Sequence, residues 1–312
     1  MSEKTPPQSA PAGERIAKRL ARSGVASRRE AERMIEAGRV RVNGKRIDSP
    51  ALNVTIADKI LVDDVPLAEA EPMRLWRYNK PTGLVTSARD EKGRATVFEK
   101  LPPELPRVMS VGRLDLNSEG LLLLTNDGEL KRKLELPSTG WLRRYRVRAH
   151  GYPTEKTLAP LTRGIKIDGE KFQPMKVEIE RQQGANVWLV IGLREGKNRE
   201  IRRALEAVGL SVNRLIRISY GPFQLGDLPT GGVEEIKGKI LRDQLGMGKA
   251  QETGENRGAA KKAAPKGSGM KARGPKPGGP KPGAPKSGGA RGPKGGSSGD
   301  TPRGGPPRSK RG

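Results

Sequence analysis

The stretch GRLDLNSEGLLLLTNDG, residues 112–128, decides how the central part of this chain folds. Successive side chains of a strand point to opposite faces of the sheet. Because Leu121–Leu124 are all apolar, they predict a strand that is buried on both faces. Residues 126–128, Asn-Asp-Gly, predict a turn directly after it. Asp115 lies in the loop before the strand, between two leucines. An aspartate there is either a partly desolvated reactive group or an Asx-turn or capping residue, and position alone favours the turn.

Short stretches of alternating apolar and polar residues surround this strand and predict a sheet. They are LWRYN at 75–79, RYRVRAH at 144–150, MKVEIE at 175–180, VWLVIGL at 187–193 and NRLIRIS at 213–219. Two helices are predicted, at 128–136 and 198–208. Because few helix-length segments separate the strands, the pattern predicts an α+β fold with a mixed, mainly antiparallel β-sheet.

Residues 14–67 predict a smaller unit, a helix-turn-helix followed by a β-hairpin. Ser27 and Glu30 have the spacing of a capping box at the head of the second helix. Asn43-Gly44 is the dipeptide most typical of a two-residue hairpin turn. Basic residues crowd this unit, which favours phosphate binding over a solvated face of mixed sign. The predicted phosphate contacts are Arg15, Lys18, Arg19, Arg28, Arg29, Arg39, Arg41 and Lys45.

The positive charge divides between a folding part and a tail. The chain carries 61 Lys and Arg against 35 Asp and Glu, a formal net charge of +26. Residues 249–312 hold 17 Gly, 10 Pro, 16 basic and 3 acidic residues, so they carry +13 and residues 1–248 carry the other +13. Such a segment buries too little apolar surface to fold. We predict a flexible N-terminus at 1–13, a basic, phosphate-binding domain at 14–67, a linker at 68–73, a second domain at 74–248 and a disordered tail at 249–312.

Deletion of the tail, residues 249–312, should weaken RNA binding and flatten its salt dependence. Each lost phosphate contact should lower the slope of log K against log salt by about 0.7–0.9, because fewer counterions are released on binding. The measurement is the dissociation constant of the full-length and shortened chains across a salt series. An unchanged slope would show that the tail is only a solubilising extension.

The residue types present exclude several kinds of chemistry. The chain has no Cys and a single histidine, His150, so a disulfide framework, a thiolate site and a multi-histidine metal site are excluded. His150 is predicted to be a strand residue. No apolar run approaches the roughly 20 residues of a membrane span, and the first residues lack the apolar core of a signal peptide. We expect a cytoplasmic monomer that binds a polyanion and uses carboxylates, Tyr, Lys or Arg as reactive groups.

Tyr145 and Arg202 are further candidate site residues. Strand alternation places Tyr145 on the apolar face of its strand, where a tyrosine either belongs to the core or stacks on a nucleobase in a cleft. Arg202 falls at the border of the buried stripe of the 198–208 helix, so it is the best local partner for a half-buried Asp115. Arg199 and Arg203 are predicted to face solvent and RNA.

Together these motifs resemble the pseudouridine synthases of the RsuA/RluB branch. The resemblance covers residues 14 to about 245, and it includes NKPTGLVTS at 79–87, residues 112–128, RYRV at 144–147, EGKNREIRR at 195–203 and RLIRISYGPFQLGDLPTG at 214–231. Residues 15–45 resemble the RNA-binding module of small-subunit ribosomal protein S-four. The features taken together are most similar to branch members that act on large-subunit (23S) ribosomal RNA. A small-subunit target and a non-catalytic RNA-binding assembly factor are the alternatives. Glu200 departs from the pattern, because a glutamine is common there.

The resemblance implies roles for the matching residues. Asp115 corresponds to the essential aspartate, which acts on the ribose anomeric carbon, on the uracil ring, or by stabilising a glycal-like intermediate. Tyr145 would pack on the target base, Arg202 would pair with Asp115, and Arg113 would fill the base stack when the uridine flips out. Further RNA contacts are implied at Lys197, Arg199 and Arg203. The product is an isomer, so neither a cofactor nor a metal is implied.

Overall fold

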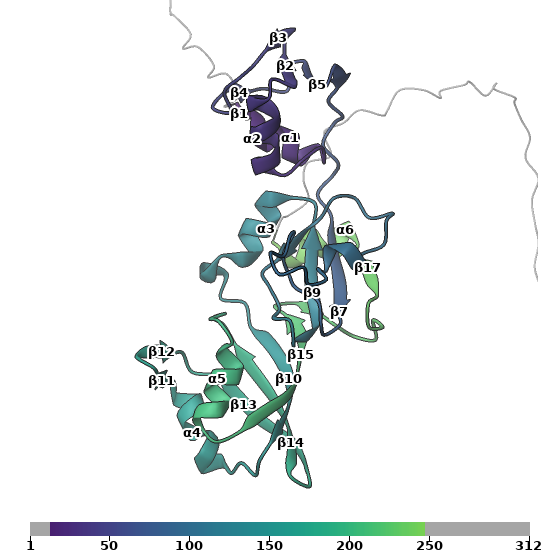
Figure 1. Cartoon of the computed structure of the whole chain (residues 1–312). Helices are drawn as coiled ribbons and strands as arrows, with labels where there is room; N and C mark the ends of the chain where they lie inside the picture. The colour runs from purple at the N-terminus through teal and green to yellow at the C-terminus, as the bar shows by residue number, and fades with distance from the viewer. Residues whose placement is uncertain (1–12, 247–312) are drawn as a thin grey trace, which may run out of the picture. The chain divides into compact units, whose positions relative to one another are not determined.

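The structure of the chain is a computed structural model that describes residues 13–246 (Figure 1). Residues 1–12 of the predicted flexible N-terminus and the whole predicted tail, 249–312, lie outside the described residues. Within residues 13–246, no helix has both the length and the apolar character that crossing a membrane requires.

The first part of the described chain is the predicted helix-turn-helix followed by a small sheet. Its helices are α1 (Ile16–Arg22) and α2 (Arg28–Glu36). Its strands are β1 (Glu14–Arg15), β2 (Val40–Val42), β3 (Lys45–Arg46), β4 (Asn53–Val54), β5 (Ile60–Val62) and β6 (Val65–Pro66). They form a four-stranded antiparallel sheet in the order β3-β2-β5-β6 and a separate β1-β4 pair. Ile16, Leu20 and Ile35 are fully buried in a shared apolar core.

The local sequence signals of this part are largely confirmed. The Ser27 side chain accepts a hydrogen bond from Glu30 N at 3.1 Å and so caps α2. The reciprocal half of the predicted capping box is not formed, because the Glu30 carboxylate instead pairs with Arg33 at 2.7 Å. Asn43 (φ 50°) and Gly44 (φ 81°) are both left-handed, as a two-residue turn between β2 and β3 requires.

A nine-stranded mixed sheet dominates the rest of the described chain. Its strands are β7 (Leu75–Lys80), β8 (Met109–Val111), β9 (Glu119–Thr125), β10 (Arg143–His150), β13 (Lys176–Gln183), β14 (Asn186–Leu193), β15 (Ser211–Tyr220), β16 (Phe223–Gln224) and β17 (Val233–Glu235). The main order is β13-β14-β10-β15-β9-β7-β17, with β8 paired to β9 and β16 to β15. Every pair is antiparallel except β9 and β15, which run parallel. The predicted mixed, mainly antiparallel sheet is confirmed.

Helices cover parts of this sheet. The predicted helices appear as α3 (Gly128–Glu135) and α5 (Glu200–Ala207). The sequence did not predict α4 (Glu155–Arg163), which contains Pro160, or the short α6 (Gly238–Gln244). Two 3-10 turns, Phe98–Lys100 and Pro137–Thr139, and the hairpin of β11 (Ile165–Ile167) and β12 (Glu170–Phe172) complete the described elements. α4 packs on β13, α5 on β15, and α3 on β8 and β9 (Figure 1).

Strand β9 is buried on both faces, as its four leucines predict. Leu121–Leu124 all have no exposed surface. Leu121 and Leu123 belong to one apolar cluster, whereas Leu122 and Leu124 belong to another on the opposite face. At the start of the strand, Gly120 has φ 96°, and a Cβ there would lie 2.4 Å from Arg217 O. Only a glycine allows this close approach of β9 to β15, directly after the loop that carries Asp115.

Candidate active site

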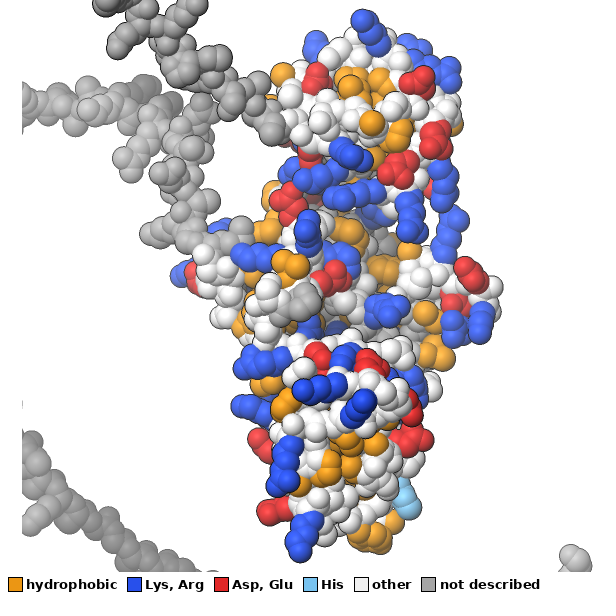
Figure 2. Space-filling model, turned by 90° about the vertical axis from the view of Figure 1, so that its left-hand side faces the viewer, with side chains coloured by type: hydrophobic (Ala, Val, Ile, Leu, Met, Phe, Trp, Pro, Cys, Tyr) orange, Lys and Arg blue, Asp and Glu red, His pale blue; other side chains and the backbone are white. Residues whose placement is uncertain are grey.

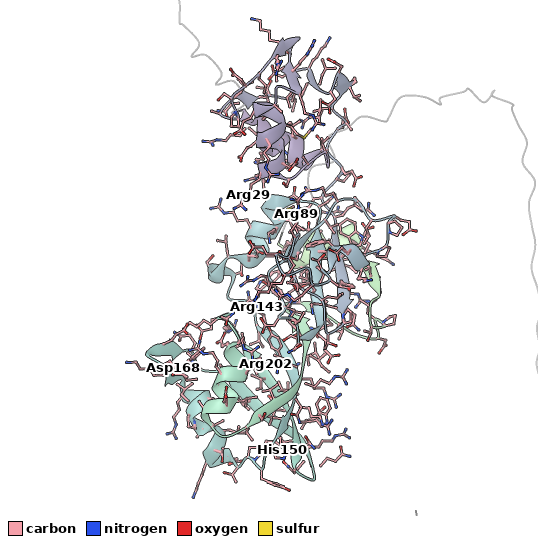
Figure 3. The ribbon with its side chains drawn as sticks, viewed as in Figure 1. Arg29, Arg89, Arg143, His150, Asp168 and Arg202 are labelled. Carbon is pink, nitrogen blue, oxygen red and sulfur yellow. The ribbon has the colours of Figure 1, made fainter. Side chains whose placement is uncertain are left out.

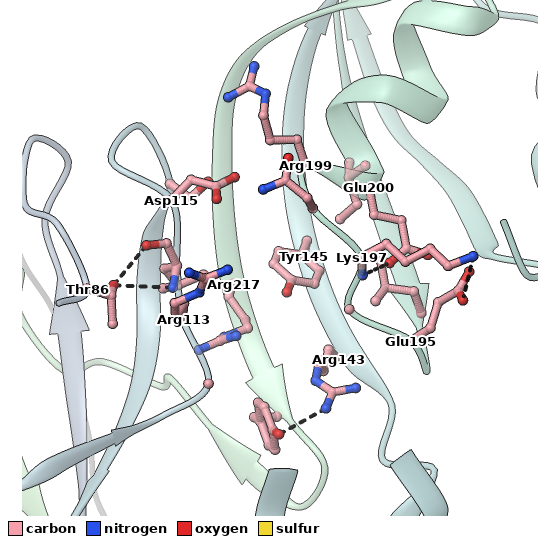
Figure 4. Close-up of a pocket in the computed structure, with 18 of the residues that line it drawn as sticks. Thr86, Arg113, Asp115, Arg143, Tyr145, Glu195, Lys197, Arg199, Glu200 and Arg217 are labelled. Atoms are coloured by element: carbon pink, nitrogen blue, oxygen red, sulfur yellow. Dashed lines mark hydrogen bonds and ion pairs between the residues drawn. The ribbon is translucent and has the colours of Figure 1, made fainter. Parts of the chain in front are cut away.

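A pocket of about 820 Å³ lies beside the carboxyl-terminal half of β15, where several elements meet (Figure 4). Its walls come from the loop 112–118 before β9, from β10 and β15, and from the segment 193–201 between β14 and α5. Seven of its lining residues are Lys or Arg and four are Asp or Glu. Asp115 and Tyr145 both line it, so the structure brings together two residues that the sequence singled out separately.

Hydrogen bonds hold the backbone of the Asp115 loop firmly, whereas its carboxylate has no partner within residues 13–246. Ser118 N donates to Asp115 O at 3.0 Å, and Gly83 N donates to Leu116 O at 2.8 Å. The Thr86 hydroxyl donates to Leu114 O at 2.8 Å. Among residues 13–246, no hydrogen bond or ion pair uses the Asp115 carboxylate. The alternative of an Asx-turn or capping residue therefore has no support here, because its defining side-chain bond is not formed.

Lys80, the last residue of β7, anchors this loop from inside the protein. Its side chain is fully buried, and Nζ donates to Asp115 O at 3.2 Å, Ser118 O at 2.9 Å and Pro81 O at 2.9 Å. Burial lowers the pKa of Lys80 to about 8, and the negative charge of Asp115 opposes that shift. The sequence analysis missed this role. The alternation of the strand could have indicated it, because Lys80 falls on the same face of β7 as the buried Trp76 and Tyr78.

Tyr145 has features of both predicted alternatives. It is half-buried on β10, on the same face as the fully buried Val147, and it packs against two apolar clusters. It also lines the pocket, so part of its ring faces the open space. His150, at the far end of β10 from Arg143, is an exposed strand residue, as predicted (Figure 3).

The predicted ion pair between Arg202 and Asp115 is not present, and this expectation is corrected. Arg202 does not line the pocket. Its Nη2 donates to Asn117 O at 2.7 Å and its Nη1 to Val212 O at 3.1 Å. Burial lowers the pKa of Arg202, the charge of Arg199 acts in the same direction, and Asp115 opposes both. Because backbone carbonyls accept from both of its Nη groups, Arg202 holds the Asp115 loop and influences the carboxylate only through space.

The chain is similar in sequence to proteins of known families. Residues 74–207 match the RNA pseudouridylate synthase family and residues 14–60 match the S4 domain. An uncharacterized RNA pseudouridine synthase of Rickettsia prowazekii (strain Madrid E) is 48% identical over 233 residues, which cover 75% of this chain and 98% of that protein. This chain belongs to the RNA pseudouridylate synthase family.

Two further similarities extend this result. Ribosomal large subunit pseudouridine synthase B of Haemophilus influenzae (strain ATCC 51907) is 41% identical over 253 residues, which cover 77% of this chain and 70% of that protein. A crystal structure of a pseudouridylate synthase aligns with a TM-score of 0.52 and 28% identity, covering 74% of this chain and 99% of that one. The chain is thus a pseudouridine synthase, an isomerase that acts on RNA.

Two of the residues predicted to contact RNA, Lys197 and Arg203, form ion pairs with carboxylates of this synthase. Arg203 pairs with Glu170 at 2.7 Å, and its guanidinium lies 4.8 Å from the centre of the Phe172 ring. Lys197 lies over the same ring at 5.1 Å and pairs with Glu195 at 3.4 Å. Arg203 is only partly exposed, because the β11–β12 hairpin lies near α5 and supplies Glu170 and Phe172.

Arg113 and Arg199, by contrast, are exposed at the pocket and carry unmatched charge. Both line the pocket, and neither forms an ion pair within the described part of the chain. Arg199 has a left-handed backbone (φ 47°) directly before α5. Figure 2 shows many Lys and Arg side chains, and fewer Asp and Glu, on the face in view. Such a surface suits a polyanion.

The basic residues of the S4 domain divide in the same way. Arg39 binds Asp63 with two hydrogen bonds, and Arg41 lies 3.4 Å from Asp64. Lys18 and Arg19 both lie within ion-pair distance of Glu14, at 3.6 and 4.0 Å. Between residues 13 and 246, the exposed residues that pair with no carboxylate include Arg15, Arg28, Arg29 and Lys45. Of the predicted contacts in this domain, these four are exposed cations that no carboxylate of the described residues neutralises.

The surroundings of Glu200 show why a glutamate can stand where a glutamine is common in the family. It is 4% exposed, and one carboxyl oxygen accepts a hydrogen bond from Lys197 N at 2.9 Å. Burial raises the pKa of Glu200 to about 8, and the neighbouring Glu195 adds to the shift. The side chain is therefore protonated at neutral pH. A protonated carboxyl offers one donor and one acceptor, much as a glutamine amide does.

Replacement of Glu200 by Gln should change how stability depends on pH. From its ordinary pKa of 4.5 up to about 8, the unfolded chain loses the Glu200 proton while the folded chain keeps it. The free energy of unfolding of the wild type should therefore fall as pH rises through this window. E200Q lacks this dependence and should gain stability relative to the wild type between pH 5 and pH 8.

Urea unfolding of the full chain at several pH values measures the effect. Glu206→Gln is the matched control, because Glu206 lies exposed on the same helix. It should follow the wild type at every pH. Parallel pH profiles for the wild type and E200Q would contradict the raised pKa of Glu200.

Proposed function

We propose that this synthase converts one uridine of large-subunit ribosomal RNA to pseudouridine, with the Asp115 carboxylate as the reactive group. The observation that carries the proposal is a half-buried carboxylate in a basic pocket that a tyrosine ring also lines. Hydrogen bonds hold its loop, and no group in the described part of the chain pairs with its oxygens. A carboxylate held in this way is free to meet a substrate atom.

The reaction needs little beyond a placed carboxylate and a held base. The glycosidic bond from ribose C1′ to uracil N1 breaks, the base rotates, and a new bond forms from C1′ to uracil C5. The proton on C5 leaves and N1 gains one, so the product is an isomer of the substrate. A carboxylate suits this work, because it can attack or stabilise an electron-poor sugar centre, as in glycosidases.

Tyr145 and Arg113 are suited to hold the extruded base and to offset the cost of extruding it. Tyr145 presents a half-buried ring in the pocket, where it can pack on the extruded uracil and accept a proton. Extrusion of a base costs on the order of a few kcal/mol. The exposed guanidinium of Arg113 can offset part of that cost by filling the stack. We infer that Arg202 acts as a positioning residue through Asn117 O.

The large-subunit target is supported by the relative of Haemophilus influenzae, which is named as a large-subunit enzyme. A second relative with that name, from Salmonella typhi, is 41% identical over 232 residues, which cover 72% of this chain and 79% of that protein.

A small-subunit target is the alternative. The test is to map pseudouridine in ribosomal RNA from cells with and without the gene. Loss of one pseudouridine from large-subunit RNA is the expected result, whereas a loss confined to small-subunit RNA would overturn the proposal.

An alternative function for a pocket with such a carboxylate is that of a metal-dependent nuclease. The acidic residues near Asp115 argue against it, because both already have partners. Glu119 binds Arg214 through two hydrogen bonds of 2.6 and 2.9 Å, and Asp127 caps α3 by accepting from two backbone amides. Neither is free to share a cation with Asp115. Isomerisation should therefore continue at an unchanged rate in excess EDTA. A rate that falls with EDTA and recovers with Mg²⁺ would contradict this prediction.

A further inference from the structure

Arg217, in the middle of the sheet, is a buried cation that has no anionic partner among the described residues. It is 2% exposed, its Nε donates to Leu121 O at 2.7 Å, and its Nη2 is buried without a partner. Within residues 13–246 it forms no ion pair. Burial of an unpaired charge is costly, so an isolated guanidinium at this depth needs compensation. Because Arg217 lines the pocket, that compensation can come from a ligand.

A second guanidinium, that of Arg143, lies against the same aromatic ring. The guanidinium carbon of Arg143 lies 4.7 Å, and that of Arg217 5.3 Å, from the centre of the Tyr220 ring. Tyr220 is 1% exposed, accepts a hydrogen bond from Arg143 at 3.0 Å and donates one to Leu134 O at 2.9 Å. The ring is thus a fixed support that holds two positive charges in one part of the pocket.

The guanidinium of Arg143 also donates hydrogen bonds only to neutral groups among the described residues. Besides Tyr220, its closest acceptor is the backbone carbonyl of Arg194, at 2.9 Å. In the described part of the chain it forms no ion pair. Two guanidinium groups with no carboxylate between them, each carrying planar pairs of N–H donors, match the oxygens of a phosphate better than any neutral ligand.

The two guanidinium groups of Arg143 and Arg217 lie apart from the Asp115 carboxylate, as the phosphate and the reacting ribose of a bound nucleotide would require. Figure 4 draws Tyr145 between Asp115 and Arg143, and Arg217 on the same wall as Arg113. A ribose at Asp115 with its base against Tyr145 would carry its phosphates away from the carboxylate. That arrangement keeps the phosphate apart from the negatively charged Asp115, which would otherwise repel it.

We propose that Arg143 and Arg217, supported on the Tyr220 ring, bind one backbone phosphate of the RNA next to the uridine that is modified. The inference rests on the proposed function and names a contact that the RNA makes in the same pocket. Neither residue belongs to the set that the sequence predicted. Both are binding residues, since they touch the phosphate and not the reacting atoms.

The test is a chemical double-mutant cycle on an RNA fragment that contains the mapped uridine. The phosphates 5′ and 3′ of that uridine are replaced, one at a time, by neutral methylphosphonates. With the wild type, one of the two replacements should lower kcat/KM by about tenfold or more, as expected for loss of a partly buried charge pair. With Arg143→Gln the same replacement should change kcat/KM by less than about threefold, because the partner is already gone.

Arg144→Gln is the matched control, since Arg144 is exposed on the opposite face of the same strand. It removes the same charge one residue away and should remain as sensitive to the methylphosphonate as the wild type. Arg217→Lys keeps the charge but loses the planar pair of donors, so it should lie between the wild type and R143Q. Circular dichroism and thermal unfolding of each variant show that it is folded.

Two results would overturn the proposal. One is equal methylphosphonate sensitivity of R143Q and R144Q. The other is a wild type that is insensitive to both methylphosphonates yet inhibited by inorganic phosphate in an Arg143-dependent way, which would assign the pair to a free anion. Failure of the proposed function is distinguishable from both, because the wild type would then form no pseudouridine in any large-subunit fragment.

Discussion

Asp115→Asn should abolish pseudouridine formation while leaving the RNA bound. The amide keeps the size of the carboxylate, but it removes the negative charge and the nucleophilic oxygen pair. The loss in kcat should be at least about 10⁴-fold, as for other reactive residues that act in a unit. Affinity for RNA should change by less than about threefold, because binding rests mainly on basic side chains that the substitution leaves in place.

The measurement is single-turnover pseudouridine formation together with a binding titration on the same RNA. Asp243→Asn is the control, because Asp243 is exposed on α6 and does not line the pocket. It should behave as the wild type in both assays. If D115N still formed pseudouridine at a rate within tenfold of the wild type, the reactive group would have to be sought elsewhere in the pocket.

Lys80→Met should cost both activity and stability. The methionine side chain fills nearly the same volume, but it leaves the carbonyls of Pro81, Asp115 and Ser118 without their shared donor. An unsatisfied buried acceptor costs about 1–3 kcal/mol, and removal of the buried ammonium's desolvation cost offsets part of this. We expect the free energy of unfolding to fall by about 1–3 kcal/mol. Because the Asp115 loop loses its anchor, kcat should fall on the order of 100-fold.

Hydrogen exchange separates the two effects of K80M. The amide of Ser118, which donates to Asp115 O, should exchange faster in K80M than in the wild type, at a denaturant concentration far below unfolding. Lys100→Met serves as the control, since Lys100 is exposed. An unchanged Ser118 amide with full activity would mean that Lys80 does not position the loop.

Local sequence signals predicted most of the sheet, because they depend only on residues that are close in the chain. The alternation at 144–150 and the four leucines at 121–124 each lie inside a strand with matching burial. The Asn43-Gly44 turn formed because its left-handed dihedrals are a property of those two residues. The signal failed at α4, where Pro160 interrupts a helical pattern that Thr154 nonetheless caps.

Side-chain partners across long sequence separations could not be predicted in the same way. Helical position alone made Arg202 the best partner for Asp115, yet both its Nη donors went to backbone carbonyls. Arg203 has a solvent-facing position on an isolated helix, but in the protein it is half-buried and pairs with Glu170 of the β11–β12 hairpin. In both cases the deciding atoms belong to segments that the helix sequence does not contain.

Local patterns in the amino-acid sequence were enough to predict an S-four-like module and a mixed sheet, and they singled out Asp115 and Tyr145. What holds Asp115 and what surrounds it could be seen only in the folded chain. Lys80 reaches its loop from another strand, and Arg143 and Arg217 both contact Tyr220 at the β10–β15 pair. Periodicity predicts which face of an element is buried, because it depends only on neighbouring residues. The partner of a buried charge depends instead on which distant segment packs against that face.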